Sequence, residues 1–290
     1  MNEALAWRTG SPSMICDDLT AEAFDTIAKI AYDHAGLSMA RSKMTLVKSR
    51  IVRRLRDLKL SSFEEYVRLV EQPEADAERQ RLISALTTNV SHFFRENNHL
   101  ELLRTSVLPD LLERAGRGGK VRIWSAGCSN GQEPYSIAMT LAVLAPDIAA
   151  RNVRILATDV DAVVLNFARE GRYPLSMMES VPAHFRTRFF APGDQPVTEF
   201  LVDQSLAGLI SFKQLNLHGP WPMTGKFDII FCRNVMIYFD EPTQQRLLSR
   251  FLSILSPQGW LMLGHSERLP SALAPSFHKA GTTAFQKLPD

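Results

Sequence analysis

The chain has 290 residues, of which 45% are hydrophobic and 22% charged, and its formal net charge is +2. This length and composition predict about two domains with sizeable buried cores. The nearly balanced charge excludes the general polyanion binding that a strongly basic chain would show.

Cysteine, histidine and hydropathy patterns narrow the class of protein further. Cys16, Cys128 and Cys232 lie far apart with no paired spacing, which is typical of a reduced cytosolic protein and gives no zinc framework. His92 and His99 are spaced to share a helix face, but two histidines do not make a metal site, so we expect no metal. No run approaches the roughly 20 apolar residues of a membrane span, and the N-terminus has no signal-peptide pattern. We expect a cytoplasmic protein without membrane insertion.

Helical periodicity runs through the first part of the chain. Residues 1–14 are expected to form a flexible tail and residues 15–90 a helical N-terminal domain, because no β-like alternation interrupts them. A longer amphipathic pattern, over about 96–115, predicts a linker helix within 91–119. The four helices expected before it are one from Asp18 to a C-cap at Gly36, one over 43–59, one opening at the capping box Ser62-x-x-Glu65, and one near 77–87.

The pattern changes after the glycine-rich breaker at 116–119. Continuous apolar strands alternating with helices are typical of a parallel sheet covered on both faces. Residues 120–290 therefore predict an α/β domain that binds its ligand at the carboxyl ends of the strands. The apolar runs are VRIWSAG, VRILATD, KFDIIFCRN and GWLMLGH, and the helical stretches are 133–145, 161–170 and 241–255.

The segment 171–208 interrupts this alternation. HFRTRFF has a helical pattern, and TEFLVDQSLAGLISF indicates a hairpin that runs into the next core strand. We therefore expect a small inserted β-subdomain over about 171–208.

The stretch RIWSAGCSNGQEPYSIA, residues 122–138, has the outline of a strand, a turn with Gly127 and Gly131, and a helix. Such a turn commonly holds phosphate at the helix N-terminus, although glycines after a strand are often only tight-turn residues. Here Glu133 stands where the helix is expected to begin. A carboxylate favours the helix dipole but repels phosphate.

The second predicted strand ends at Asp159, where this kind of fold places a carboxylate that accepts hydrogen bonds from ribose hydroxyls. Asp161 is the expected N-cap of the next helix. A nucleoside without phosphate therefore fits the turn. S-adenosylmethionine is such a nucleoside, and Glu133 is expected to pair with its positive charge while Gly127 lets the backbone approach closely.

Six motifs carry a family resemblance. Together and in this order, they resemble the CheR-type chemoreceptor glutamate methyltransferases of bacterial chemotaxis, and the resemblance spans about residues 18–288. The motifs are LTTNVSHFFRE (86–96), WSAGCSNGQEPYSIAM (124–139), ATDVD (157–161), NL (216–217), FDIIFCRNVMIYFD (227–240) and LGHSE (263–267).

The resemblance implies an S-adenosylmethionine-dependent methyltransferase fold, with a Rossmann-like sheet, an all-helical N-terminal domain and an inserted β-subdomain. It implies esterification of glutamate side chains on a receptor's cytoplasmic coiled coil, with S-adenosyl-L-homocysteine as product. Without it, Arg233 and Asn234 would be interpreted as strand-end caps. The cofactor contacts that it implies are Asn89, Ser91, Arg95, Glu133, Asp159, Asn216, Leu217, Arg233 and Asn234.

The chain departs from the family pattern at three places. Family members usually have Thr where Ser91 stands, and commonly an aromatic residue or Thr where His92 stands. The stretch 191–199, APGDQPVTE, does not resemble the subdomain of members that grip a receptor's C-terminal tail. A receptor-tail contact at the inserted subdomain is therefore left open.

Methyl transfer to glutamate needs placement rather than deprotonation, because the carboxylate is already ionised at pH 7. Arg95 is the first catalytic candidate, since a guanidinium matches a carboxylate with two parallel hydrogen bonds; the alternative is a structural pair with Glu96. Tyr238 is the second, and its alternative is packing against Phe239. His265 is a weaker candidate, for which a core role is the more common outcome.

The predicted helix within 41–59 holds eight basic residues and one acid. Its apolar stripe is Met44, Val47, Ile51, Leu55 and Leu58, which leaves Arg53 and Arg56 pointing outward. A charge run is commonly only a solvated face, but the asymmetry favours an acidic partner. We expect the receptor's acidic coiled coil rather than nucleic acid.

Two alternatives remain at this stage. One is a non-catalytic module with the same fold that senses the cofactor or docks partners. The other is a nucleic-acid methyltransferase, an interpretation that depends on the basic helix alone.

Overall fold

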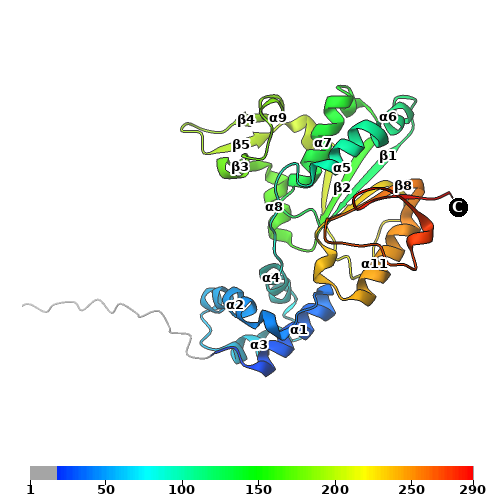
Figure 1. Cartoon of the computed structure of the whole chain (residues 1–290). Coiled ribbons are helices and arrows are strands. Elements are labelled where there is room, and N and C mark those ends of the chain that lie inside the picture. Colours follow the sequence, from blue (N-terminus) through cyan, green and yellow to red (C-terminus); the bar gives the residue numbers. More distant parts are fainter. Residues whose placement is uncertain (1–17, 290) are drawn as a thin grey trace, which may run out of the picture. The chain divides into compact units, whose positions relative to one another are not determined.

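The computed structural model describes residues 18–289. These residues form two compact units, one made of residues 18–33 and 39–86 and the other of residues 34–38 and 87–289. Figure 1 shows the whole chain coloured along its sequence. The predicted tail, residues 1–14, and Cys16 lie outside the described residues.

The first unit is helical, as its periodicity indicates. Its core contains Ile51, Phe63 and Leu82, none of which is exposed. Ser62 caps the third helix by accepting a hydrogen bond from the Glu65 amide at 3.2 Å. The helices are α1 (Ala21–Ala35), α2 (Met44–Leu58), α3 (Phe63–Glu71) and α4 (Asp76–Leu86), with a short 3-10 turn at Arg41–Lys43.

The predicted linker helix is interrupted. It consists of α5 (Asn97–Leu102), a π-helical turn (Leu103–Val107) and α6 (Leu108–Gly116). Pro109 stands at the start of α6, and proline has no amide hydrogen to donate to the preceding turn. The prediction of one continuous helix was therefore wrong at the turn Leu103–Val107.

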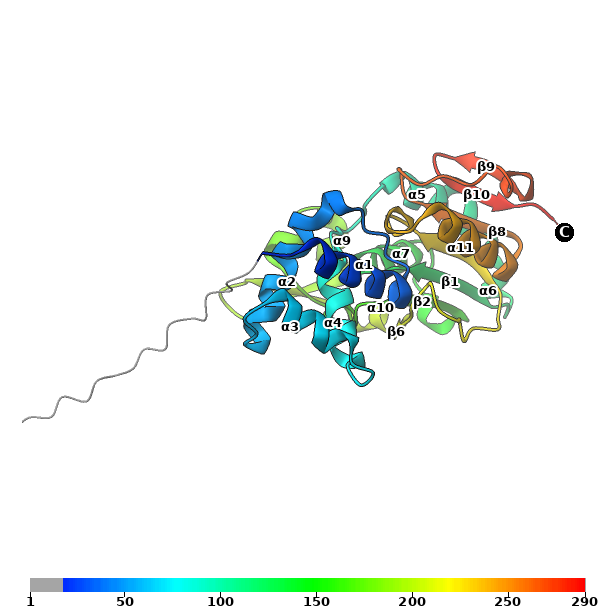
Figure 2. The ribbon, with the colours of Figure 1, turned by 90° about the horizontal axis from the view of Figure 1, so that it is seen from below.

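The second unit contains a seven-stranded sheet in the order β6-β2-β1-β7-β8-β10-β9. The first five strands in that order pair in parallel, whereas β10 is antiparallel to both its neighbours. Figure 2 shows β9 and β10 at one edge of the sheet beside β8. The strands are β1 (Val121–Ala126), β2 (Val153–Asp159), β6 (Ile210–Gln214), β7 (Phe227–Cys232), β8 (Leu255–Leu263), β9 (Phe277–Gly281) and β10 (Ala284–Lys287).

Helices cover both faces of this sheet, with α7 (Gln132–Leu144) on one face and α11 (Glu241–Ile254) on the other (Figure 1). Adjacent residues of β1 serve the two faces, because side chains alternate along a strand. Ile123 belongs to the core that contains α7, while Trp124 packs against Trp221 and against Phe251 of α11. The parallel strands covered by helices on both faces that the sequence predicts are present.

The segment after α8 (Ala162–Glu170) forms a separate three-stranded sheet in the order β3-β5-β4. The hairpin within it joins β4 (Phe190–Pro192) to β5 (Glu199–Val202). The predicted hairpin from β5 into β6 is wrong, because Asp203 caps a helical turn, α10 (Gln204–Ala207), that separates strands of two different sheets. The remaining strand is β3 (Arg172–Pro174), and α9 (Ala183–Phe189) lies between β3 and β4 in the chain.

No helix among residues 18–289 is long and apolar enough to cross a membrane.

Candidate functional site

A pocket with an empty volume of about 990 Å³, open to solvent, lies in the second unit at the carboxyl ends of β1, β2 and β7. This is the edge at which doubly wound sheets bind ligands. The pocket brings together every residue that the sequence analysis assigned to the cofactor, and both main catalytic candidates; the weaker candidate, His265, is not among its lining residues. The residues brought together are Asn89, Ser91, Arg95, Gly127, Glu133, Asp159, Asn216, Leu217, Arg233, Asn234 and Tyr238.

The turn after β1 requires glycine. Gly127 has a φ of +84°, and a Cβ atom there would lie 2.3 Å from Cγ2 of Val235 in the loop after β7. The amides of Gly127 and Cys128 donate to the carbonyl of Thr158 on β2, at 2.7 and 2.9 Å. The turn therefore packs against the ends of β2 and β7, and it lines the pocket.

Asp159 ends β2 and is buried. Its carboxylate accepts hydrogen bonds from the amides of Ser129, at 2.8 Å, and Asp161, at 3.0 Å. Burial raises the pKa of Asp159, and these backbone hydrogen bonds oppose the rise. A carboxylate oxygen has two lone pairs, so Asp159 keeps acceptor capacity for a ligand hydroxyl.

Asp161 joins the segment before the linker helix to this strand end. As predicted, it caps α8, accepting from the Val163 amide at 2.9 Å. Its second oxygen accepts from Nδ2 of Asn89 at 2.8 Å, and Ser129 Oγ donates to the Asn89 carbonyl at 3.3 Å. Asn89 is therefore held at the pocket wall beside Asp159.

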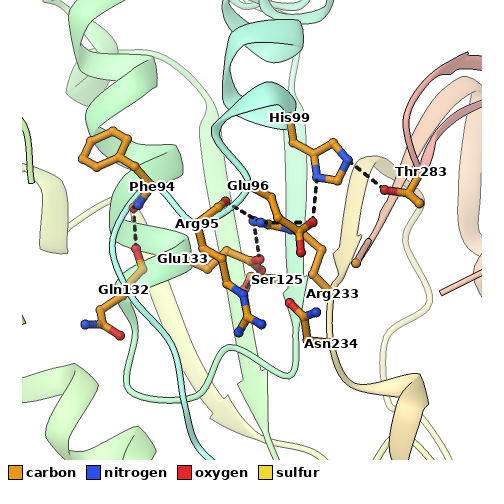
Figure 3. Close-up of polar contacts among 12 residues, drawn as sticks. Phe94, Arg95, Glu96, His99, Ser125, Gln132, Glu133, Arg233, Asn234 and Thr283 are labelled. Atoms are coloured by element: carbon orange, nitrogen blue, oxygen red, sulfur yellow. Dashed lines mark hydrogen bonds and ion pairs between the residues drawn. The ribbon is translucent and has the colours of Figure 1, made fainter. Parts of the chain in front are cut away.

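Glu133 lies in the first turn of α7 and is 15% exposed. Its carboxylate accepts from Ser125 Oγ at 2.7 Å and from Arg233 Nη1 at 3.1 Å. Figure 3 shows Arg233 between Glu133 and Glu96. Burial raises the pKa of Glu133, although Arg233 and Ser125 act in the opposite direction. The negative charge of Glu133 is thus partly compensated by Arg233 before any ligand binds.

The two catalytic candidates lie on different segments of the pocket wall. Arg95 is half-buried, and its Nη1 donates to the Val90 carbonyl at 2.9 Å. The alternative pairing with Glu96 is wrong, because the Glu96 carboxylate contacts Arg233 and His265 instead. Tyr238 follows β7, and its hydroxyl donates to the Thr88 carbonyl at 3.3 Å. Arg95 has four further N–H groups that can bind a carboxylate.

Asn216 and Leu217 line the pocket after β6, but the Asn216 side chain is already engaged. Its amide nitrogen donates to the His34 carbonyl, and its oxygen accepts from the His218 amide at 2.9 Å. Their side chains shape the wall, and Leu217 is 8% exposed.

Glu267, the last residue of the LGHSE motif, has a role that its sequence pattern did not predict. Its buried carboxylate accepts hydrogen bonds from four backbone amides, those of Gly264, Asn234, Val235 and Met236, at 2.6 to 3.1 Å. Burial raises the pKa of Glu267, and these four hydrogen bonds act in the opposite direction. Glu267 thereby fixes the loop that carries Asn234 and Tyr238. Its signal in the sequence was an acid three residues after Gly264, the glycine that follows β8.

The histidine predictions are corrected by the structure. His265 is exposed and its Nδ1 lies 3.0 Å from Glu96 Oε1, so it neither lines the pocket nor belongs to the core. His92 and His99 do not share a helix face, because His92 precedes α5. His92 lines the pocket, whereas His99 is buried and contacts Thr283. Within residues 18–289, no group of three or more potential ligands is arranged for a metal ion.

These residues fit a cationic nucleoside. Asp159 offers acceptors at the strand end, and Val90, Leu217, Val235 and Phe239 give the pocket apolar walls. Glu133 and Glu96 share one guanidinium, that of Arg233. The ionised cluster therefore carries one more negative than positive charge.

Comparison with known proteins identifies the family. Residues 22–87 match the model "CheR methyltransferase, all-alpha domain", and residues 89–285 match "CheR methyltransferase, SAM binding domain". A probable chemotaxis protein methyltransferase of Rhizobium etli is 47% identical over 88% of this chain and 96% of its own length. Chemotaxis protein methyltransferase 2 of Pseudomonas aeruginosa is 45% identical, over 87% and 89%. The Escherichia coli chemotaxis protein methyltransferase is 41% identical, over 90% and 89%.

One similar solved structure is that of another methyltransferase. The DszA carbon methyltransferase is 17% identical, with a TM-score of 0.38, over 80% of this chain and 48% of that chain. The two family models together cover nearly all of the described residues. The chain belongs to the CheR methyltransferase family and is an S-adenosylmethionine-dependent methyltransferase.

Proposed function

We propose that this enzyme esterifies glutamate side chains in the cytoplasmic region of chemoreceptors, with S-adenosyl-L-methionine as methyl donor and S-adenosyl-L-homocysteine as product. The names of its relatives support a role in chemotaxis. The observation that carries the proposal is one pocket that gathers two carboxylates, Glu133 and Asp159, with the guanidinium of Arg95. The carboxylates suit a cationic nucleoside, and the guanidinium suits a carboxylate substrate.

The cofactor would be held by the strand ends. Asp159 would accept hydrogen bonds from the ribose, and Glu133 would face the positively charged end of the cofactor. The Gly127 turn would lie against the cofactor. Asn89, Ser91 and the Arg233–Asn234 pair would complete the walls, together with Asn216 and Leu217. When bound, the cofactor supplies an electrophilic methyl group and a neutral leaving group; no metal is required for this chemistry.

The protein would accelerate the reaction by placement. The substrate glutamate must arrive ionised, aligned and stripped of water, with its oxygen about 3 Å from the methyl group. Arg95 would orient it through the N–H groups that the Val90 carbonyl leaves available. Tyr238 lies on the segment after β7, and its hydroxyl would fix the position of the methyl donor or of the acceptor carboxylate. No general base is needed.

The first unit offers a surface for the acidic receptor. Val47, Ile51 and Leu55 of the predicted stripe on α2 are buried, Met44 and Leu58 are half-buried, and Arg53 and Arg56 are exposed. Exposed guanidinium groups attract an acidic helix over roughly one Debye length. We therefore place receptor contact on this face of α2, in the cytoplasm where the receptor's methylated region lies.

Incubation with radiolabelled cofactor and receptor cytoplasmic fragments tests the proposal. We expect label on glutamate that is released as methanol by mild alkali. Arg95→Ala should lower the rate strongly and Arg95→Lys should restore little, because an ammonium does not reproduce the planar fork. Tyr238→Phe should lower turnover at saturating cofactor without weakening cofactor binding. Alkali-stable label, or label on nucleic acid, would refute the ester reaction.

A further inference from the structure

Glu96 has a contact set that the proposed function does not use. It precedes α5 with a left-handed φ of +50°, a conformation that a non-glycine residue keeps only when its surroundings fix it. Its Oε1 accepts from His265, at 3.0 Å from Nδ1 and 3.3 Å from the amide. Its Oε2 lies 3.5 Å from Arg233 Nη2 and 3.8 Å from His99 Nδ1. Figure 3 shows Glu96 directed at Arg233 with His99 beside it.

Arg233 is shared between two acids. Its side chain is 3% exposed; Nη1 lies 3.1 Å from Glu133 Oε2, and Nη2 donates to the Arg95 carbonyl and faces Glu96. Burial alone would raise the pKa of Glu96, but His265 and Arg233 together hold it below its usual range. Burial lowers the pKa of His99 and so disfavours the charged form of that ring. One guanidinium thus compensates two carboxylates.

We infer that Glu96 is a positioning residue that competes with Glu133 for the guanidinium of Arg233. The negative charge of Glu133 is then only partly compensated, and this sets the preference of the pocket for the sulfonium cofactor over its product. This inference rests on the proposed function. The product differs from the cofactor in having an uncharged sulfur atom. Removal of the Glu96 charge would leave the Arg233 guanidinium to compensate Glu133 alone, and a less negative wall discriminates less between the two compounds.

Calorimetric titration of the full chain with S-adenosylmethionine and, separately, with S-adenosylhomocysteine tests the inference at pH 8. For Glu96→Gln, we expect the ratio of the two affinities to shift toward the product by on the order of fivefold. Glu101→Gln is the matched control, because Glu101 is an exposed acid of α5 paired with Arg104. It should leave the ratio unchanged. Loss of structure alone would weaken both ligands together and leave the ratio in place.

Two further variants separate charge from packing. Glu96→Asp keeps the charge, so its affinity ratio should stay near that of the wild type even if both affinities fall. His265→Lys serves as the second variant if Glu96→Gln does not fold. The side chain of residue 265 is 66% exposed, and a lysine there would compensate the charge of Glu96. The ratio of the two affinities should therefore shift in the same direction. An unchanged ratio in the folded Glu96→Gln or His265→Lys protein would overturn the inference. A wild-type chain that binds neither compound would overturn the proposed function itself.

Discussion

Arg54 and Glu78 form a two-point ion pair between α2 and α4, with Nε 2.9 Å from Oε1 and Nη2 2.8 Å from Oε2. Glu78 is 8% exposed and also accepts from the Tyr66 hydroxyl at 3.1 Å. This hydrogen-bonded pair raises the pKa of Arg54. Arg50 likewise donates to the carbonyls of Ala85 and Leu86. Part of the positive charge of α2 therefore stabilises the helical unit rather than facing a partner.

Glu78→Gln is expected to destabilise the protein by about 1.5–3 kcal/mol, because Arg54 loses its two-point charged partner and, of its ion pairs in the described chain, keeps only that with Asp57. The free energy of unfolding, from urea titration followed by circular dichroism, measures the loss. Glu74→Gln is the control, since Glu74 is exposed, and its change should stay within about 0.5 kcal/mol. Equal stability of the two variants would show that the pair adds little.

Reversal of the outward face of α2 tests receptor contact. Arg53→Glu with Arg56→Glu should leave cofactor affinity unchanged and lower the rate of receptor methylation at low salt. The wild-type rate should also fall with rising salt, because charges at the surface are screened within about 8–10 Å at 0.1–0.15 M.

The same charge change made elsewhere is the control for this reversal. Arg117→Glu with Lys120→Glu alters two exposed residues just before β1, at the end of the strand away from the pocket. This pair should methylate receptor fragments at the wild-type rate. If the two double variants behave alike, α2 has no special part in receptor recognition.

Gly127→Ala should cost both stability and cofactor affinity. An alanine Cβ would meet Val235 Cγ2 at 2.3 Å in addition to the unfavourable positive φ, together about 2–5 kcal/mol. Gly118→Ala separates the two effects, because Gly118 has a φ of +87° but no atom within 4 Å of the added Cβ. It should cost only about 1–2 kcal/mol and leave binding intact. Thermal unfolding and calorimetry on both variants make the comparison.

Asp159→Ala should lower affinity for S-adenosylmethionine by roughly 10- to 150-fold, through loss of a charged acceptor worth about 1.5–3 kcal/mol. Calorimetry measures the change, and wild-type protein should bind neither NAD nor ATP. Asp147→Ala is the control, because Asp147 is exposed and pairs only with Arg151 among the contacts of its carboxylate in the described chain. Wild-type affinity in Asp159→Ala would refute a role for this strand end.

Local pattern was enough to predict the elements that bury one continuous apolar face. The strands of the parallel sheet and the four helices of the first unit are examples, and the family motifs named the residues that line the pocket. Contacts that depend on distant segments were not predictable. Glu267 bonds to amides 31 to 33 positions away, apart from the local bond to Gly264. Arg233 lies 100 positions from Glu133 and 137 from Glu96.

The strand predictions that were wrong or missing have local causes. The hairpin predicted into β6 depended on apolar alternation, but the capping side chain of Asp203 favours a helical turn at that point. The hairpin of β9 and β10 was missed because each strand has at most five residues and no long apolar run.

The pKa shifts of the pocket set the expected pH dependence. Burial raises the pKa of Glu133 and of Asp159, so each binds its proton more tightly in the folded chain than in the unfolded one. Their charges are therefore lost at a higher pH than those of ordinary carboxylates. A cationic ligand needs the charged forms, so affinity for S-adenosylmethionine should fall as the pH is lowered through this range and level off above it.

Between about pH 6.5 and 8.5 the methylation rate should be nearly flat at saturating cofactor. The substrate glutamate is already ionised throughout this range. Burial, followed by the charge of Arg95, lowers the pKa of His92 and so disfavours its charged form. Initial rates of methyl-ester formation across this range, at constant ionic strength, make the test. His92→Gln should give the same flat profile. A steep rise through pH 6.5 that disappears in His92→Gln would establish a histidine base and contradict the placement mechanism.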